Sequence, residues 1–158
     1  KMPFIASHYG WYYKHTVLDR LVVEQPDTRW GEAAFVMRQH ATEYCAANPI
    51  HFPDIIAKNE QFLREHPTTP YRMEALFQLA QAYDDWWNAG RGTEEHFGID
   101  RAKYASRRNE MRRKAIAAYD EVRVAEPDSK RGRWAALRLP RLKLSLGTDW
   151  YRFVDSCS

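Results

Sequence analysis

A proline turn between two amphipathic segments constrains this chain more than any other feature of its sequence. In the stretch 66–83, one segment ends at His66-Pro67 and a second begins after Pro70. From Met73 onward, apolar residues follow one another in steps of three and four, which is the spacing of one helical face. A hydroxyl after the turn can cap the new helix, and a proline suits its first turn. The stretch therefore predicts two helices joined by a tight turn.

Two further proline turns repeat this arrangement, and the three turns align on Pro26, Pro67 and Pro127. An alanine stands eight residues after each proline, an apolar residue five before it and a hydroxyl two after it: Ala34, Ala75 and Ala135; Leu21, Phe62 and Val122; Thr28, Thr69 and Ser129. Two helices that meet at a tight turn need a small residue where their backbones approach most closely. We therefore interpret the three turns as an internal repeat.

Helical spacing continues between the turns, and no stretch indicates a strand. The expected helices span 9–24, 29–46, 53–65, 70–88, 99–125 and 130–146, followed by a short one from 148. We expect residues 1–8 to be irregular, and Trp30 and Met37 to face the interior. Pro140 should kink its helix or form a bulge. The sequence therefore predicts an all-α fold.

The composition limits the class of protein. A chain of 158 residues suffices for one domain, and six tryptophans with nine tyrosines supply ample packing area. The net charge of +3 only weakly indicates an acidic partner. No apolar run approaches the length of a transmembrane helix, and no signal peptide is present in the residues shown. Cys45 and Cys157 lack the spacing of a redox or zinc pair, so two ordinary thiols are expected, with a disulfide between them left open.

Two sets of residues stand at spacings that a known repeat shares: Leu79, Ala80 and Tyr83, then Ala115, Tyr119, Val122 and Pro127. In these positions the chain resembles the tetratricopeptide repeat family. The segments 62–70 and 115–129 look most like its bacterial periplasmic branch, which includes the Tol-Pal-associated cell-division coordinator and the lipoprotein of the β-barrel assembly machine. The resemblance implies antiparallel helical hairpins stacked as a right-handed superhelix, an α-solenoid of about six to seven helices, in a single domain over residues 1–158.

One part of the chain departs from the repeat. Ala115 lies 32 positions after Tyr83, whereas the corresponding residues of the ordinary repeat are about nine positions apart. An insertion is therefore expected at about residues 88–112. It contains a stretch with three glycines in ten residues, 89–98, and the charged first half of the helix expected over 99–125.

The resemblance implies a non-enzymatic scaffold or adaptor of the bacterial cell envelope that binds a segment of a partner protein on a concave helical surface. It places the protein in the periplasm or at the outer membrane, with the cytoplasm left open and any membrane association made through an anchor outside the chain shown. Six residues are expected to be exposed for partner contact: Arg38, Gln39 and Thr42, which are polar where the repeat ordinarily packs, and Tyr83, Trp87 and Arg138. Because Trp86 and Trp87 point about 100° apart on a helix, at most one of them should be central to the core.

An alternative function rests on basic charge. Residues 101–143 hold 14 basic and five acidic side chains. Arg107, Arg108, Arg112 and Arg113 form the candidate site for phosphates, nucleic acid or another anionic polymer. No aromatic pattern typical of nucleic-acid readers accompanies them. We therefore expect a solvated helix face whose arginines pair with the acidic Asp84, Asp85, Glu94 and Glu95, and do not expect nucleic acid as the partner.

Catalytic and metal-binding patterns are weak. His40, Cys45 and His51 lack the spacing of a zinc site, and the adjacent Asp84 and Asp85 point to different helix faces. A third alternative is an enzyme with a site in the segment 88–100, which contains Glu94, Glu95 and His96. Because no nucleophile or phosphate-binding loop can be nominated, we expect no enzyme activity, no metal and no cofactor.

Overall fold

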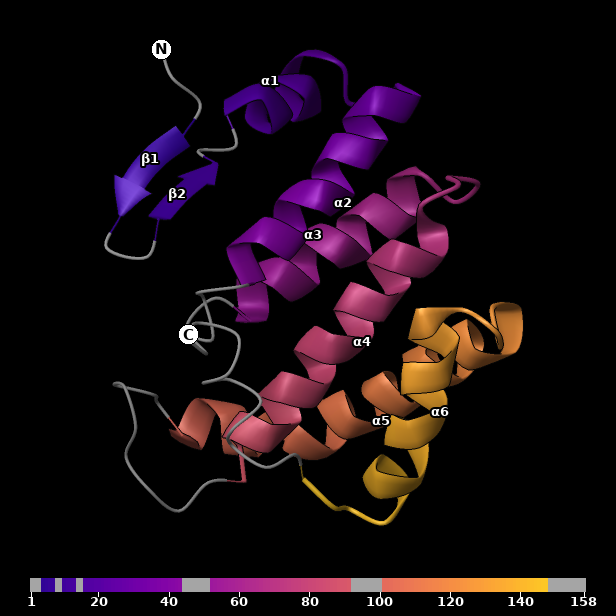
Figure 1. Cartoon of the computed structure of the whole chain (residues 1–158). Helices are drawn as coiled ribbons and strands as arrows, with labels where there is room; N and C mark the ends of the chain where they lie inside the picture. Colours follow the sequence, from indigo (N-terminus) through magenta and orange to yellow (C-terminus); the bar gives the residue numbers. More distant parts are fainter. Residues whose placement is uncertain (1–3, 8–9, 14–15, 44–51, 92–100, 148–158) are drawn as a thin grey trace. The chain divides into compact units, whose positions relative to one another are not determined.

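The fold is helical (Figure 1). The computed structural model describes residues 4–7, 10–13, 16–43, 52–91 and 101–147. Six helices lie in these residues: α1 (Thr16–Glu24), α2 (Arg29–Glu43), α3 (Phe52–Glu65), α4 (Arg72–Ala89), α5 (Arg101–Ala125) and α6 (Lys130–Lys143). The helical prediction is therefore confirmed. The helix expected from Thr148, both cysteines and residues 92–100 lie outside the described residues.

The chain divides into two compact units, Lys1–Thr42 and Glu43–Ser158. The first unit begins with an antiparallel hairpin of β1 (Phe4–Ser7) and β2 (Gly10–Tyr13), in which Phe4 lies opposite Tyr13. This hairpin corrects the expectation that no stretch forms a strand. It also corrects the expectation of an irregular start and a helix from Tyr9, because α1 begins only at Thr16. The two strands contain four aromatic residues and Ile5, and these residue types favour paired strands.

The turn between α1 and α2 decides which face of α2 points inward. A Cβ atom on Gly31 would lie 1.9 Å from the Gln25 carbonyl oxygen, so this face must abut the turn. Gly31 and Ala34 are accordingly buried. The prediction that Trp30 and Met37 face the interior is wrong, since they remain 69% and 59% exposed. Turn geometry, and not the bulk of the aromatic ring, sets the orientation of the helix.

The second unit contains α3 to α6, and we refer to these helices as the four-helix unit. α4 packs against α3 and α5, and α5 packs against α6. The residues from Ala75 to Ala80 are all buried, as is typical of a helix covered on several sides. Phe77 meets the Trp134 ring of α6 edge-on, with ring centroids 5.6 Å apart, and the Tyr119 ring of α5 at 6.0 Å. This aromatic cluster joins three helices.

The first and third proline turns share one hydrogen-bonding pattern. Thr28 Oγ1 accepts a hydrogen bond from the Gly31 amide at 3.1 Å, and Ser129 Oγ accepts one from the Gly132 amide at 2.9 Å. Each hydroxyl also donates to the carbonyl three residues earlier. The second turn differs, because Thr69 Oγ1 accepts from the Tyr71 amide, 3.2 Å away. The repeated alanines Ala34, Ala75 and Ala135 are all buried, as the repeat predicts.

The last described helix is shorter than expected. The sequence predicts a helix to Leu146, but α6 ends at Lys143. Ser145 adopts a left-handed backbone conformation with φ of 60°, which stops the helix. The Leu146 amide then closes the end by donating to the Arg141 carbonyl oxygen, 2.7 Å away. Pro140 lies inside the final turns of α6.

Candidate functional site

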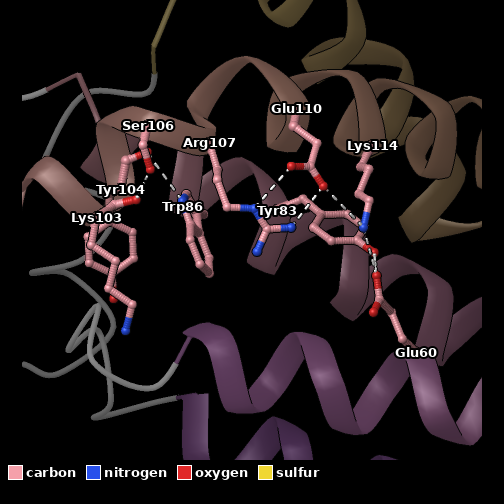
Figure 2. A network of polar contacts seen from close by, with 9 residues as sticks. All are labelled: Glu60, Tyr83, Trp86, Lys103, Tyr104, Ser106, Arg107, Glu110 and Lys114. Atoms are coloured by element: carbon pink, nitrogen blue, oxygen red, sulfur yellow. Dashed lines mark hydrogen bonds and ion pairs between the residues drawn. The ribbon is translucent and has the colours of Figure 1, made fainter.

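Glu60, Tyr83 and Lys114 join three helices of the four-helix unit through one carboxylate oxygen (Figure 2). The Tyr83 hydroxyl of α4 donates to Glu60 Oε1 of α3 at 2.5 Å, and Lys114 Nζ of α5 donates to the same oxygen at 3.0 Å. The Lys114 ammonium group also lies 5.2 Å from the centroid of the Tyr83 ring. The three side chains therefore fasten α3 and α5 to α4.

Both acidic groups of this network have displaced pKa values. Burial raises the pKa of the Tyr83 hydroxyl, and the hydrogen bond to Glu60 raises it further. Burial also acts to raise the pKa of Glu60, but the hydrogen bonds from Tyr83 and Lys114 outweigh it and hold the pKa below its ordinary 4.5. At neutral pH, Tyr83 is thus protonated and Glu60 ionised, which suits a fixed donor and acceptor and not proton transfer.

Arg107 continues the network along α5 (Figure 2). Its guanidinium group donates twice to the Glu110 carboxylate, at 3.0 and 2.8 Å, and lies 5.6 Å from the centroid of the Trp86 ring. The hydrogen bond from Arg107 is the main cause that lowers the pKa of Glu110. Trp86 in turn donates from its indole nitrogen to the Tyr104 carbonyl oxygen at 3.3 Å. Arg107 is therefore already occupied by protein groups.

A second polar cluster centres on Asp84, which is fully buried in α4. Arg138 of α6 donates Nε to Asp84 Oδ2 at 2.6 Å and Nη2 to Asp84 Oδ1 at 2.7 Å. Asn88 Nδ2 donates to Oδ1 at 2.9 Å, and the Tyr119 hydroxyl lies 3.5 Å from Oδ2. Each carboxylate oxygen is thus satisfied, as a buried charge requires.

Several arginines hold the end of α6. Arg112 donates to the Leu142 and Lys143 carbonyl oxygens at 2.7 and 2.8 Å. Arg138 reaches the Leu146 carbonyl oxygen at 3.2 Å, and Arg141 reaches that of Gly147 at 2.9 Å. The last carbonyls of a helix carry partial negative charge and favour such cations. Several basic side chains of residues 101–143 therefore stabilise the end of α6.

Three of the six residues expected to be exposed for partner contact lie in the four-helix unit. Tyr83, Trp87 and Arg138 are all buried, so the expectation that they are exposed is wrong. Trp87 is enclosed by the Arg91, Arg112 and Arg138 guanidinium groups, 4.6, 6.0 and 6.0 Å from its ring centroid. The expectation that at most one of Trp86 and Trp87 is central is also wrong, because both are buried.

The other predicted contact residues lie in α2. The Arg38 side chain is partly exposed, and its Nε lies 2.5 Å from Asp19 Oδ1. This ion pair ties α2 to α1 within the first unit. The side chains of Gln39 and Thr42 lie outside the described residues. A role of these three residues in partner binding stays a prediction.

The four arginines of the alternative anion site are not equivalent. Arg107 is bound to Glu110, and Arg112 is bound to carbonyl oxygens of α6. Arg108 and Arg113 are exposed, and the part of the chain that the structure describes offers them no ion pair. Of the carboxylates expected to neutralise the basic half, Asp84 does pair with an arginine. Glu94 and Glu95 lie outside the described residues.

The described residues contain neither a cluster suited to a metal ion nor a helix suited to spanning a membrane. Over residues 4–43, 52–91 and 101–147, excepting the short gaps at 8–9 and 14–15, no group of three or more His, Cys, Asp or Glu side chains is suited to holding a metal ion. Cys45, His51 and His96 fall outside the described residues, as does the His40 side chain. None of the described helices is both long and apolar enough to cross a lipid bilayer.

The surface that sequence reasoning missed is the solvent-facing side of α6. We define the outer face of α6 by its exposed residues together with the exposed Leu144 that follows the helix: Lys130, Arg133, Ala136, Leu137, Pro140, Arg141, Lys143 and Leu144. Leu137 is 77% exposed and Leu144, which caps the helix, is 71% exposed. The opposite side buries Ala135, Leu139 and Leu142. The sequence does contain a signal for this surface, because Leu137 and Leu144 do not share the helix face that carries Ala135, Leu139 and Leu142.

Comparisons of the chain with family models, with curated proteins and with solved structures found no match. The tetratricopeptide resemblance therefore stays a prediction.

Proposed function

We propose that this chain is a non-enzymatic helical module that binds a segment of a partner protein on the outer face of α6. The observation that supports this most is the exposure of Leu137 and Leu144, at 77% and 71%, on a helix whose opposite face is already packed. Exposed leucines grouped on one side of a helix form an apolar surface that a partner can cover. The inner side meets α4 and α5, and the outer side is left for a partner.

The spacing of the exposed leucines suits an elongated partner. Leu137 and Leu144 are seven residues apart, so they project from the same side of the helix about two turns apart. Ala136 and Pro140 are exposed beside them and extend the apolar strip. Removing such an apolar surface from water contributes favourably to the free energy of binding, and the entropic cost of association offsets part of that contribution. A helix or an extended segment laid along α6 would cover both leucines.

The inner contacts of α6 make this surface rigid. Arg138 is fixed by Asp84, and Arg131 bridges the carboxylates of Glu74 and Glu126. Trp134 packs against the Phe77 and Tyr119 rings. A surface held in its binding shape before the partner arrives loses less conformational entropy on binding. The buried charges thus support a binding platform and not a catalytic centre.

The cellular setting belongs to the same proposal and rests on the resemblance alone. The family implies a bacterial cell-envelope adaptor in the periplasm or at the outer membrane, with hairpins stacked as a right-handed superhelix. The shared geometry of the turns at Pro26 and Pro127 supports repetition of one helical unit. We propose α6 in place of the concave surface built on Tyr83, Trp87 and Arg138, since those side chains are buried.

Selection from a displayed library of helical peptides tests the proposal. The wild-type chain should enrich a family of sequences, and the double variant Leu137→Ser, Leu144→Ser should not enrich that family. The control Val23→Ser changes an apolar residue of α1 that is equally exposed, and it should select as the wild type does. Circular dichroism and urea unfolding verify that each variant folds. Enrichment of the same peptides by the double variant, or no enrichment by the wild type, would overturn the proposal.

A further inference from the structure

We infer that the segment bound on the outer face of α6 is an acidic amphipathic helix. The inference rests on the proposed function and adds the chemistry of the partner. It is carried by the juxtaposition of two exposed leucines with basic side chains that pair with no carboxylate among the described residues.

α6 has an unusual balance of charge. Its 14 residues contain six basic side chains and no acidic one. Two of the six face inward and are neutralised, Arg138 by Asp84 and Arg131 by Glu74 and Glu126. These two therefore contribute to the fold, and neither presents an uncompensated positive charge to a partner.

The other four basic residues of α6 are Lys130, Arg133, Arg141 and Lys143, and all four are exposed. Arg133 donates to the Asp128 carbonyl oxygen and Arg141 to the Gly147 carbonyl oxygen. A backbone carbonyl satisfies a hydrogen-bond donor but does not cancel a formal charge. Over the described part of the chain, no ion pair joins any of these four to a carboxylate. The outer face of α6 thus carries four uncompensated positive charges.

These charges flank the apolar strip along its length. Arg133, Leu137 and Arg141 follow one another at intervals of four residues, so they form one row on the helix. Lys143 precedes Leu144 in the chain and points about 100° away from it, so its charge lies to one side of the apolar strip. A partner helix with apolar residues along one line and Asp or Glu on either side of it would cover the leucines and meet the cations. The strip is too short to specify more than about two turns of such a helix.

Pro140 leaves one backbone carbonyl of α6 without its regular helical hydrogen bond. Because Pro140 has no amide hydrogen, it cannot donate to the Ala136 carbonyl oxygen, as residue 140 of a regular helix would. Ala136 is itself exposed on the outer face of α6.

The same observations disfavour other occupants. A second copy of α6 would place like charges against each other, which costs affinity. A membrane-surface helix inserts a continuous apolar face, whereas on α6 the row through Leu137 also holds Arg133 and Arg141. A single-stranded nucleic acid needs exposed aromatic rings for stacking, and the outer face of α6 contains none.

Fluorescence anisotropy with labelled synthetic helices tests the inference on the full chain. Three peptides share one apolar stripe and differ only in the flanking residues, which are Glu, Gln or Lys. At low salt the Glu peptide should bind about tenfold more tightly than the Gln peptide, and the difference should shrink as salt screens the charges. The Lys peptide should bind most weakly.

Two sets of variants separate charge from apolar contact. The triple variant Arg133→Gln, Arg141→Gln, Lys143→Gln should lose the preference for the Glu peptide and keep its affinity for the Gln peptide. The double variant Leu137→Ser, Leu144→Ser should bind neither. Unfolding in urea verifies that both variants retain the wild-type fold, so that a loss of binding reports the surface.

The outcomes distinguish the inference from the proposed function. Equal affinity for the Glu and Gln peptides would overturn the acidic partner and leave the binding module standing. Failure of every peptide to bind would overturn both. Tighter binding of phosphatidylserine vesicles or of a 20-nucleotide DNA strand than of the Glu peptide, lost in the triple variant, would also overturn the inference. So would dimerisation in light scattering that the leucine variant abolishes.

Discussion

Arg138 and Asp84 face each other in the interior of the four-helix unit, with both carboxylate oxygens bound by the guanidinium group at 2.6 and 2.7 Å. The two residues are 54 positions apart in the chain and connect α4 to α6. Only 3% of the Arg138 side chain and none of the Asp84 side chain is exposed to solvent. The pair therefore positions α6, and with it the surface proposed to bind a partner.

Removing one member of this pair should destabilise the protein strongly. Arg138→Met leaves the Asp84 carboxylate buried without its cation, and the free energy of unfolding should fall by about 3–5 kcal/mol. Urea unfolding followed by circular dichroism measures the change. Arg133→Met is the matched control, because Arg133 is exposed on the same helix and its loss should cost less than about 0.5 kcal/mol.

A double variant distinguishes the loss of the ion pair from the cost of burying an unpaired charge. Asp84→Leu combined with Arg138→Met removes both charges, and it should regain most of the stability lost in Arg138→Met. If Arg138→Met alone costs less than about 1 kcal/mol, the ion pair does not hold α6 as described.

Glu60 should make the protein less stable in acid. Its pKa is lower in the folded state than the ordinary 4.5, so the unfolded chain binds more protons and stability rises with pH. The contribution is fully present above pH 4.5 and is lost as the pH falls through the lowered folded-state value. The difference in unfolding free energy between the wild type and Glu60→Gln should therefore shrink below pH 4.5. Urea unfolding at several pH values measures this difference.

Tyr83→Phe provides the control for that prediction. It removes one of the hydrogen bonds to Glu60 and leaves the one from Lys114. The acid dependence attributed to Glu60 should be reduced but still present. An unchanged difference between wild type and Glu60→Gln from pH 7 to pH 3 would contradict the described network.

The hydroxyl of Ser129 should stabilise the start of α6. Its Oγ accepts a hydrogen bond from the Gly132 amide, which otherwise has no partner within the helix. Ser129→Ala should lower the unfolding free energy by about 1 kcal/mol, and Ser129→Thr should retain most of it. Thermal unfolding compares the two. Equal loss in both variants would indicate that packing, and not the cap, is responsible.

Gly132→Ala should reverse the usual effect of alanine in a helix. Alanine ordinarily favours an exposed helix interior over glycine by about 1 kcal/mol. At position 132 a Cβ atom would lie 1.9 Å from the Glu126 carbonyl oxygen, so the turn must shift. We expect a loss of about 1–3 kcal/mol in urea unfolding. Ala117→Gly on the exposed side of α5 is the control for ordinary propensity, and a stabilised Gly132→Ala would disprove the turn geometry.

The sequence by itself determined the helices and the turns between them. Helical periodicity and capping depend on residues a few positions apart, so α2 to α6 and the buried positions of Ala75 and Ala135 could be predicted. The same local reasoning missed the hairpin over residues 4–13, because its stability depends on pairing of the two strands.

Only the tertiary structure decided which polar and aromatic side chains are available to a partner. The periodicity of α4 gives one preferred face, whereas contacts with α3, α5 and α6 cover several, so both Trp86 and Trp87 are buried. Arg138 is buried because Asp84, distant in sequence, supplies its counter-charge. Leu137 is exposed because the packing of α6 uses the opposite side of that helix. These outcomes depend on where other helices lie, which no single helix encodes.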